Sequence, residues 1–102
     1  MDLVLHALAE QRRRDILTLV WHDEMTAGDI AAHFDVSRPA VSQHLAILRD
    51  AELVAVRPLG TRRFYRARPE TIAAVRDYLD AFWDNSLERL KRAVEGTAHG
   101  NG

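Results

Sequence analysis

The stretch Ser37–Asp50, with the sequence SRPAVSQHLAILRD, decides how the rest of the chain can be interpreted. On a helix that turns about 100° per residue, Val41, Leu45 and Leu48 share one narrow apolar stripe. Ser37 is a favourable N-cap, and a proline in the first turn is tolerated. The opposite face carries small or hydrogen-bonding side chains: Pro39, Ser42, Gln43 and Ala46. Such a slim polar face suits a helix that enters the DNA major groove, although an ordinary amphipathic surface helix has the same pattern.

The composition limits the classes of protein that the chain can represent. It has 102 residues, enough for one domain, and 47% of them are hydrophobic, so a modest core is expected. It contains no cysteine, which excludes disulfides, thiolate metal sites and cysteine nucleophiles. The longest apolar run is about six residues, far below the roughly 20 that span a bilayer. Asp2 stands where a signal peptide would be positively charged, so we expect a cytoplasmic protein with no membrane partner.

Positive charge is concentrated in one segment of the chain. The formal net charge is only −1, but residues 53–68 contain five arginines and no acidic residue. The segments on either side are net acidic. Because the local field governs contact with phosphate, this segment indicates a nucleic-acid partner despite the near-neutral total.

Three short helices are expected before the Ser37–Asp50 helix. Residues 3–8 open a first apolar helix, and residues 16–20 supply the buried side of a second. The adjacent arginines 12–14 point in different directions on a helix, and we interpret them mainly as a solvated face. Thr26 caps a third helix, and residues 35–37 connect it to the next one. Two short helices joined by so tight a turn predict a helix-turn-helix.

A β-hairpin is predicted directly after the helix-turn-helix. Residues 53–57 (LVAVR) are β-branched and alternating, and residues 62–67 (RRFYRA) are a second strand candidate. Residues 58–61 (PLGT) have turn chemistry, with Gly60 free to adopt a positive φ. A helix-turn-helix followed by such a hairpin is the winged-helix arrangement, with the wing over residues 53–67. Its basic tip can lie along the DNA backbone or in the minor groove.

A long last helix is predicted from Glu70 to about Glu95, followed by a flexible tail over residues 96–102. Apolar residues recur along this helix in steps of three and four, which is a near-heptad seam. A single domain this small, covering residues 1–95, cannot easily bury a seam of this length. We therefore predict a homodimer to which the first helix also contributes. The predicted interface residues are Leu3, Leu5, Leu8, Ile72, Val75, Leu79, Phe82, Trp83, Leu87 and Leu90.

Together these motifs resemble the ArsR-type winged-helix repressors. The resemblance rests on residues 37–45 (SRPAVSQHL), on Leu53 and Val54, and on residues 60–65 (GTRRFY). It extends over about residues 3–95, since the segment around arginines 12–14 also fits the first two helices of that family. The resemblance implies a mainly α fold with one small hairpin, and a homodimer joined through its first and last helices. It also implies repression from a near-palindromic operator.

Many members of that family release DNA when a metal binds, but their metal-binding residues are not matched here. Residues 25–32, in the third helix, contain no cysteine, and the last helix has no histidine before His99. Carboxylates at helical spacing are more often a solvated face than a metal site. We therefore expect no metal site, no cofactor and no metal response. The alternative is an effector-responsive repressor that binds a metal or small molecule between the first and last helices, lined by His6, Tyr78, Phe82 and Trp83.

The predicted DNA-binding residues lie on the Ser37–Asp50 helix and on the wing: Ser37, Arg38, Pro39, Ser42, Gln43, His44, Arg57, Thr61, Arg62 and Arg63. Gln43 can bond an adenine edge bidentately, and Arg38 can reach a guanine or a phosphate. For any single residue a backbone contact is as well supported as a base contact, since phosphate contacts are the more numerous. His44 lies beside the apolar stripe, and we interpret it as an orienting group or a phosphate contact.

Two other classes of function are less favoured. A winged helix that binds only proteins would not need the wholly positive segment 53–68. An enzyme is not expected, because no serine, histidine and carboxylate fall at a recognisable motif spacing and no glycine-rich phosphate loop is present. The sequence thus predicts a dimeric regulator of transcription that binds specific double-stranded DNA, and the resemblance to the ArsR-type proteins implies that it is a repressor.

Overall fold

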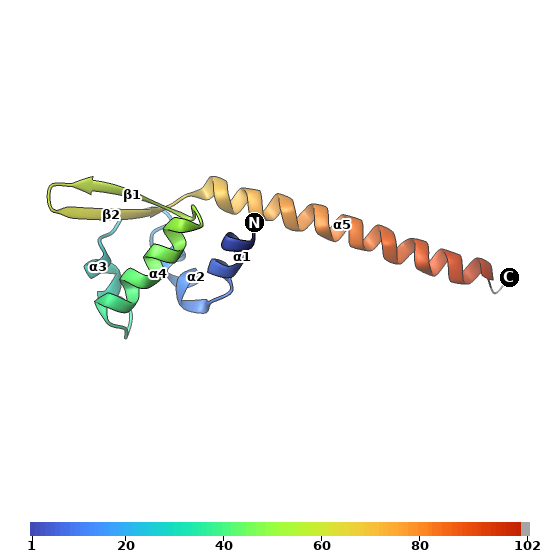
Figure 1. Cartoon of the computed structure of the whole chain (residues 1–102), viewed down its shortest axis with the longest axis horizontal. Helices are drawn as coiled ribbons and strands as arrows, with labels where there is room; N and C mark the ends of the chain where they lie inside the picture. The colour runs from blue at the N-terminus through green and yellow to red at the C-terminus, as the bar shows by residue number, and fades with distance from the viewer. Residues whose placement is uncertain (101–102) are drawn as a thin grey trace. The chain divides into compact units, whose positions relative to one another are not determined.

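The chain folds as a winged helix-turn-helix, as predicted. A computed structural model describes the backbone of residues 1–100 and the side chains of residues 1–96. The elements in chain order are α1 (Asp2–Leu8), α2 (Gln11–Leu19), α3 (Ala27–Ala32), α4 (Arg38–Asp50), β1 (Val54–Leu59), β2 (Arg62–Ala67) and α5 (Pro69–Gly100) (Figure 1). Residues Met1–Ile72 form one compact unit, and the rest of α5 forms a second.

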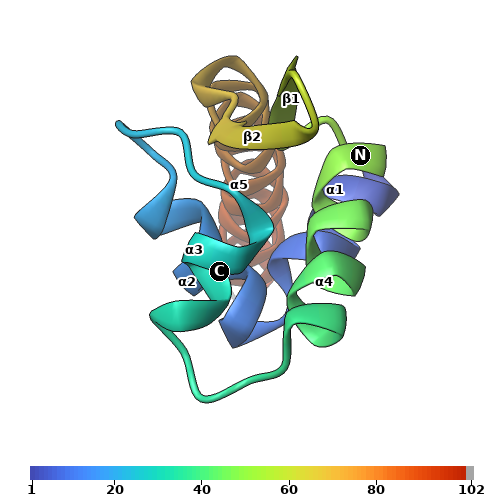
Figure 2. The same ribbon diagram turned by 90° about the vertical axis from the view of Figure 1, so that its left-hand side faces the viewer.

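The core of the Met1–Ile72 unit lies where the helices meet the base of the hairpin. Its largest fully buried side chains come from all parts of this unit and include Ile16, Ile30, Leu45, Leu48 and Leu53. Each such side chain contributes about 1.5–3 kcal/mol through burial of its apolar surface. Figure 2 shows α3 beside α4, with the hairpin across one end of the pair. The core thereby fixes the helix-turn-helix and the wing in one body.

Helix α4 has the boundaries that its sequence predicts. The Ser37 hydroxyl accepts a hydrogen bond from the backbone N–H of Ala40 at 3.2 Å, and Val41 and Leu48 are fully buried. The helix ends in a Schellman motif, in which Glu52 donates to the Arg49 carbonyl and the next residue donates to the Leu48 carbonyl. Glu52 has a φ of 60°, a conformation that favours glycine.

The hairpin turns more tightly than predicted. Leu59 pairs with Arg62, so the turn consists of Gly60 and Thr61 alone, and Gly60 has a φ of 62°. A positive φ at the first of two turn residues is typical of a II′ hairpin turn, which matches the twist of the strands. The prediction of a four-residue turn over 58–61 was wrong, because Pro58 continues β1 opposite Arg63. Proline is tolerated in an edge strand such as β1.

The hairpin is fastened to the helices by backbone hydrogen bonds from distant segments. Met25 and Tyr65 form an isolated antiparallel bridge, with N–O distances of 3.0 and 2.8 Å. The N–H of Ala67 also donates to the Val20 carbonyl at 3.0 Å. These bonds fix β2 against the segment between α2 and α3, and therefore fix the position of the wing.

Helix α5 is longer than predicted. It was expected to end near Glu95, with a tail from Gly96, but it runs through Gly100, and residues 101–102 lie outside the described part. A single glycine at position 96 weakens a helix by only about 1 kcal/mol, which its neighbours can offset. Among the described residues, no helix is both long and apolar enough to cross a bilayer.

The prediction that arginines 12–14 form a solvated face was wrong for Arg13. Its side chain is 6% exposed and turns back to the carbonyl end of α1. The last carbonyls of a helix have no intrahelical donor, and a guanidinium supplies several. Arg12 instead lies over the Phe34 ring, 4.9 Å from its centroid, and Arg14 donates to the Leu8 carbonyl.

Candidate nucleic-acid interface

A groove of about 430 Å³ opens where α3, α4 and the wing meet. Its lining includes five of the predicted DNA-binding residues, which come from two segments of the chain: Arg38, Ser42, Thr61, Arg62 and Arg63. The other lining residues are Thr26, Ala27, Gly28, Asp29 and Tyr65. The fold therefore brings the start of α4 and the basic strand of the wing to one surface. That these residues bind DNA stays a prediction.

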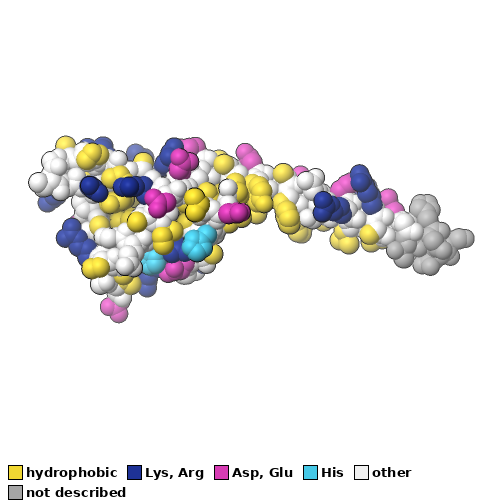
Figure 3. All heavy atoms as spheres, viewed as in Figure 1, with side chains coloured by type: hydrophobic (Ala, Val, Ile, Leu, Met, Phe, Trp, Pro, Cys, Tyr) yellow, Lys and Arg dark blue, Asp and Glu magenta, His cyan; other side chains and the backbone are white. Residues whose placement is uncertain are grey.

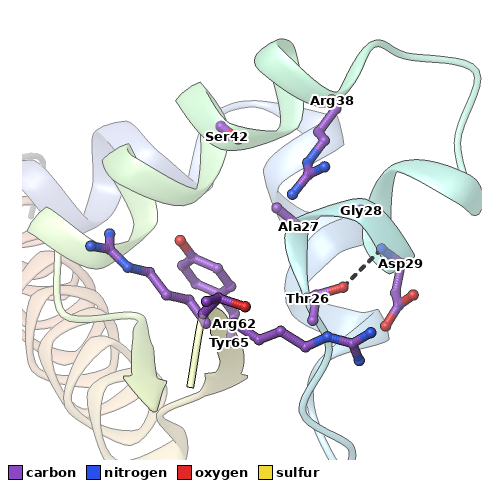
Figure 4. A pocket seen from close by; sticks show the side chains of 10 residues that line it. Thr26, Ala27, Gly28, Asp29, Arg38, Ser42, Arg62 and Tyr65 are labelled. Carbon is purple, nitrogen blue, oxygen red and sulfur yellow. Dashed lines mark hydrogen bonds between the residues drawn. The ribbon is translucent and has the colours of Figure 1, made fainter. Parts of the chain in front are cut away.

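Arg38 enters the groove from the first turn of α4. Figure 4 shows its side chain directed towards Ala27 and Gly28 on α3. A Cβ atom added to Gly28 would lie 3.9 Å from the guanidinium carbon of Arg38. Arg38 thus lies against α3, and its five N–H donors face a groove that could receive phosphate oxygens.

Three arginine side chains and one aspartate line the groove, so its net charge is positive. Arg62 and Arg63, both exposed, contribute their charge from β2, and Arg38 contributes from α4. Asp29 is the acid among the lining residues, and its backbone N–H donates to the Thr26 hydroxyl at 3.1 Å. Three cations against one anion favour a phosphate-bearing ligand.

The outer face of α4 continues the surface beyond the groove. Ser37, Pro39, Ser42 and Gln43 are exposed, and Gln43 lies opposite the buried stripe of Val41, Leu45 and Leu48. No bulky side chain stands on this face, so a helix in this position can approach base edges closely. This arrangement agrees with the face predicted from the helical pattern.

Arg57 is held by an ion pair within the protein. Its guanidinium makes a two-pronged contact with the carboxylate of Glu24, in which Nε lies 3.1 and 3.0 Å from the two oxygens. It also lies over the Phe64 ring, 5.1 Å from the centroid. Hydrogen bonding to Arg57 holds the pKa of the Glu24 carboxyl below its usual value. Arg57 is therefore paired within the protein, between the wing and the segment before α3, while its side chain stays 52% exposed. That Arg57 binds DNA stays a prediction.

His44 lies on a different flank of α4 from Gln43. Its Nδ1 is 3.5 Å from a guanidinium nitrogen of Arg13, and its Nε2 is 3.6 Å from a carboxylate oxygen of Glu10. The side chain is 18% exposed. His44 was predicted as an orienting group or a phosphate contact, and its surroundings favour the orienting role.

The contribution of α3 and of Tyr65 to the groove was not predicted from the sequence. Thr26 was recognised as an N-cap, but its position facing the wing depends on the bridge between Met25 and Tyr65. That bridge joins segments 40 residues apart in the chain and involves a single residue on one side. A signal of this kind is too short to detect as a strand pattern.

The predicted dimer residues divide into exposed and buried groups. Leu79, Phe82, Trp83, Leu87 and Leu90 are 43–62% exposed along α5, and Leu3 of α1 is 64% exposed. Figure 3 shows hydrophobic side chains along the coloured part of α5. Leu5 is half-buried, Leu8 and Ile72 pack against the core, and Val75 is 7% exposed. The exposed residues of α5 share one side of the helix and form an apolar strip along it.

Comparison with known proteins gives consistent results. Residues 4–56 match the family model described as a bacterial regulatory protein of the arsR family. The chain is 46% identical over 94 residues to the HTH-type transcriptional regulator Rv2034 of Mycobacterium tuberculosis, covering 92% of this chain and 88% of that protein. It is 43% identical over 65 residues to the transcriptional repressor SdpR of Bacillus subtilis, covering 64% and 72% of the two chains.

A solved structure extends the similarity to three dimensions. It is the solution structure of the homodimeric winged helix-turn-helix DNA-binding domain of a possible ArsR-family transcriptional regulator from Mycobacterium bovis. The two structures agree with a TM-score of 0.66 and 31% sequence identity, over 81% of this chain and 77% of that one.

Proposed function

Because this chain belongs to the arsR family of bacterial regulatory proteins, which are DNA-binding regulators of transcription, we propose that it acts as a homodimeric repressor of a near-palindromic operator. Repression is supported by the similarity to the B. subtilis repressor, and dimerisation by the homodimeric M. bovis domain. A regulator of this kind acts where the chromosome lies, so we also propose a cytoplasmic location.

The observation that carries this proposal is the groove shared by α3, α4 and β2. It places the arginines of the wing beside the slim outer face of α4, within one compact unit. In our proposal α4 enters the major groove, and the wing lies on the adjacent backbone or minor groove. Two such units related by a two-fold axis would read half-sites about 10–10.5 bp apart, or a multiple of that distance.

Individual residues take different parts in this mode of binding. Gln43, exposed at the centre of the outer face, would bond the N6 and N7 edge of adenine, and Ser42 would contact a neighbouring base or phosphate. Arg38 would bind a guanine or a backbone phosphate at the edge of the groove. Arg62 and Arg63, with the Thr61 hydroxyl, would contact phosphates beside the wing.

The dimer would form through α1 and the exposed apolar strip of α5. Phe82, Trp83 and Leu90 are each at least 60% exposed, and Leu3 presents a similar surface from α1. Large exposed side chains at near-heptad spacing favour a helical partner with the same pattern. A second copy of this chain supplies such a partner.

We also propose that DNA binding does not respond to metal ions. The chain contains no cysteine, and the described residues contain no group of three or more histidine, aspartate or glutamate side chains placed to share an ion. Titration with Zn²⁺ and Ni²⁺ during a DNA-binding measurement tests this directly. An unchanged affinity is expected, and a reproducible loss of binding would support the effector-responsive alternative.

The salt dependence of DNA binding tests the role of the groove. Removing both wing arginines, Arg62→Ala with Arg63→Ala, should weaken binding to all sequences and flatten the slope of log K against log salt. The slope falls by about 0.9 for each lost phosphate contact, so the loss reaches about 3.6 when both copies of a dimer are changed. Fluorescence anisotropy with a labelled duplex measures both quantities.

A matched control variant tests whether the loss of DNA binding depends on the position of the arginines in the groove or only on the loss of positive charge. Lys91→Ala with Arg92→Ala removes the same charge from exposed positions of α5 that do not line the groove. This variant should keep the slope of the wild type. Equal slopes for the wing variant and the wild type would show that the wing does not contact DNA phosphates.

A further inference from the structure

Arg13 has a buried charged side chain, and its contacts reach from α1 to α4, the helix proposed to enter the major groove. Its Nε donates to the Ala7 carbonyl at 2.7 Å, and a terminal nitrogen donates to the His6 carbonyl at 3.1 Å. The other terminal nitrogen donates to the Glu10 carboxylate at 2.9 Å. The guanidinium therefore caps the carbonyl end of α1. It also pairs with the carboxylate of Glu10, the N-cap residue of α2.

His44 completes this cluster from α4. Its Nδ1 lies 3.5 Å from the same nitrogen of Arg13 that binds Glu10, and its Nε2 lies 3.6 Å from the other Glu10 oxygen. An imidazole with its proton on Nε2 suits both neighbours, since Nδ1 can accept from the guanidinium while Nε2–H faces the carboxylate. The ring thus lies between one cation and one anion, and both contacts favour this orientation.

We infer that Glu10, Arg13 and His44 position the recognition helix, so that His44 governs sequence-specific DNA binding without touching DNA. This inference rests on the proposed DNA-binding function. His44 directly follows Gln43, the residue placed to read a base, and its ring is anchored to the end of α1. A bidentate contact to a base edge depends on placement within a fraction of an ångström. The buried stripe keeps α4 in the core, but releasing the ring would allow a small shift of the helix beside Gln43, and base reading would suffer before phosphate contact does.

The test compares two substitutions at His44 that differ in hydrogen bonding. His44→Leu removes the hydrogen-bond acceptor and introduces an apolar side chain of similar size. His44→Asn instead provides an oxygen acceptor near the position of Nδ1. A control, His22→Leu, changes an exposed histidine outside the cluster. Each protein is measured against a duplex selected by the wild type from random DNA and against a scrambled duplex of the same length. A thermal unfolding curve of each protein identifies a temperature at which the wild type and all three variants are folded, and binding is measured at that temperature.

We expect His44→Leu to lower the ratio of specific to non-specific affinity about tenfold, as for loss of one hydrogen bond to a charged group. The salt slope should not change, His44→Asn should recover most of the ratio, and the control should match the wild type. A reduced salt slope with equal losses on both duplexes would overturn the inference and make His44 a phosphate contact.

Two further outcomes would also overturn it. These are an unchanged ratio in His44→Leu and equal defects in the leucine and asparagine variants. If the wild type selects no sequence at all, the proposed function itself fails, and the positioning role fails with it.

Discussion

Substitution of Phe82 by alanine should weaken the homodimer strongly. The Phe82 side chain is 60% exposed in the protomer. A buried aromatic side chain removes about 150–250 Å² from water, so roughly 120 Å² of Phe82 remains to be covered by a partner. At about 25 cal/mol per Å², this area corresponds to about 3 kcal/mol in each protomer. Two-fold symmetry makes the change act twice, which gives about 6 kcal/mol as the upper limit for the dimer.

Sedimentation equilibrium over a range of concentrations measures the effect. If only half of the available area is covered in the dimer, the loss is about 3 kcal/mol, and the dimer dissociation constant still rises by about 100-fold. Circular dichroism at high concentration should show that the variant keeps its helix content. Arg92→Ala, on the opposite side of α5, serves as the control and should dimerise normally. A dissociation constant for Phe82→Ala within threefold of the wild type would refute the assignment of this strip to the dimer.

Four further predictions concern the wing, the core and the recognition helix. Glu24→Gln should free Arg57 and steepen the salt dependence of DNA binding, which anisotropy measures. Because the ion pair lowers the Glu24 pKa, its contribution to stability is complete above the ordinary carboxyl pKa. That contribution should be lost as pH falls through the lowered value, and Glu24→Gln should lack this part of the acid-unfolding profile. Glu52→Gly should stabilise the protein by about 0.5–1 kcal/mol in thermal unfolding, since relief of the positive φ exceeds the added chain entropy. Leu45→Ala should destabilise it by about 2–5 kcal/mol in urea, because the side chain is 1% exposed. Gln43→Ala should relax preference at one base position in a selection experiment, with little change in salt slope.

Local sequence patterns predict much of this fold because helix caps, apolar spacing and turn glycines depend on residues that are close together in the chain. The Ser37 cap and the apolar spacing of α4 gave the correct helix boundaries. Gly60 marked the hairpin turn, although the pattern could not show that Pro58 belongs to β1. Proline and glycine both indicate turns, and only the pairing of the strands decides how many residues the turn contains.

Two arginine contacts that the sequence patterns did not reveal join different elements of the fold. Three adjacent arginines carry no signal that Arg13 alone turns inwards, since its acceptors are backbone carbonyls of α1. Likewise, the pairing of Arg57 with Glu24 joins residues 33 apart, and the wing composition alone suggested a DNA contact. Charge composition found the basic surface, but tertiary contacts determine which of its arginines are already paired with an acid inside the protein.

The positive φ of Glu52 was also invisible in the sequence. Glycine normally marks the end of a helix in this conformation, and here a glutamate occupies the position. The two backbone hydrogen bonds of the Schellman motif and the burial of Leu53 hold it there. Packing of the next residue into the core thus outweighs a local preference.

Selection of bound sequences from random DNA, followed by a hydroxyl-radical footprint, tests the central claim most directly. The claim is that two copies of α4 read one near-palindromic operator while the wings grip the flanking backbone. The predicted result is a pair of inverted half-sites whose centres lie about 10–10.5 bp apart, or a multiple of that distance, with protection extending beyond both. Enrichment of a single half-site, or of no sequence at all, would contradict the claim.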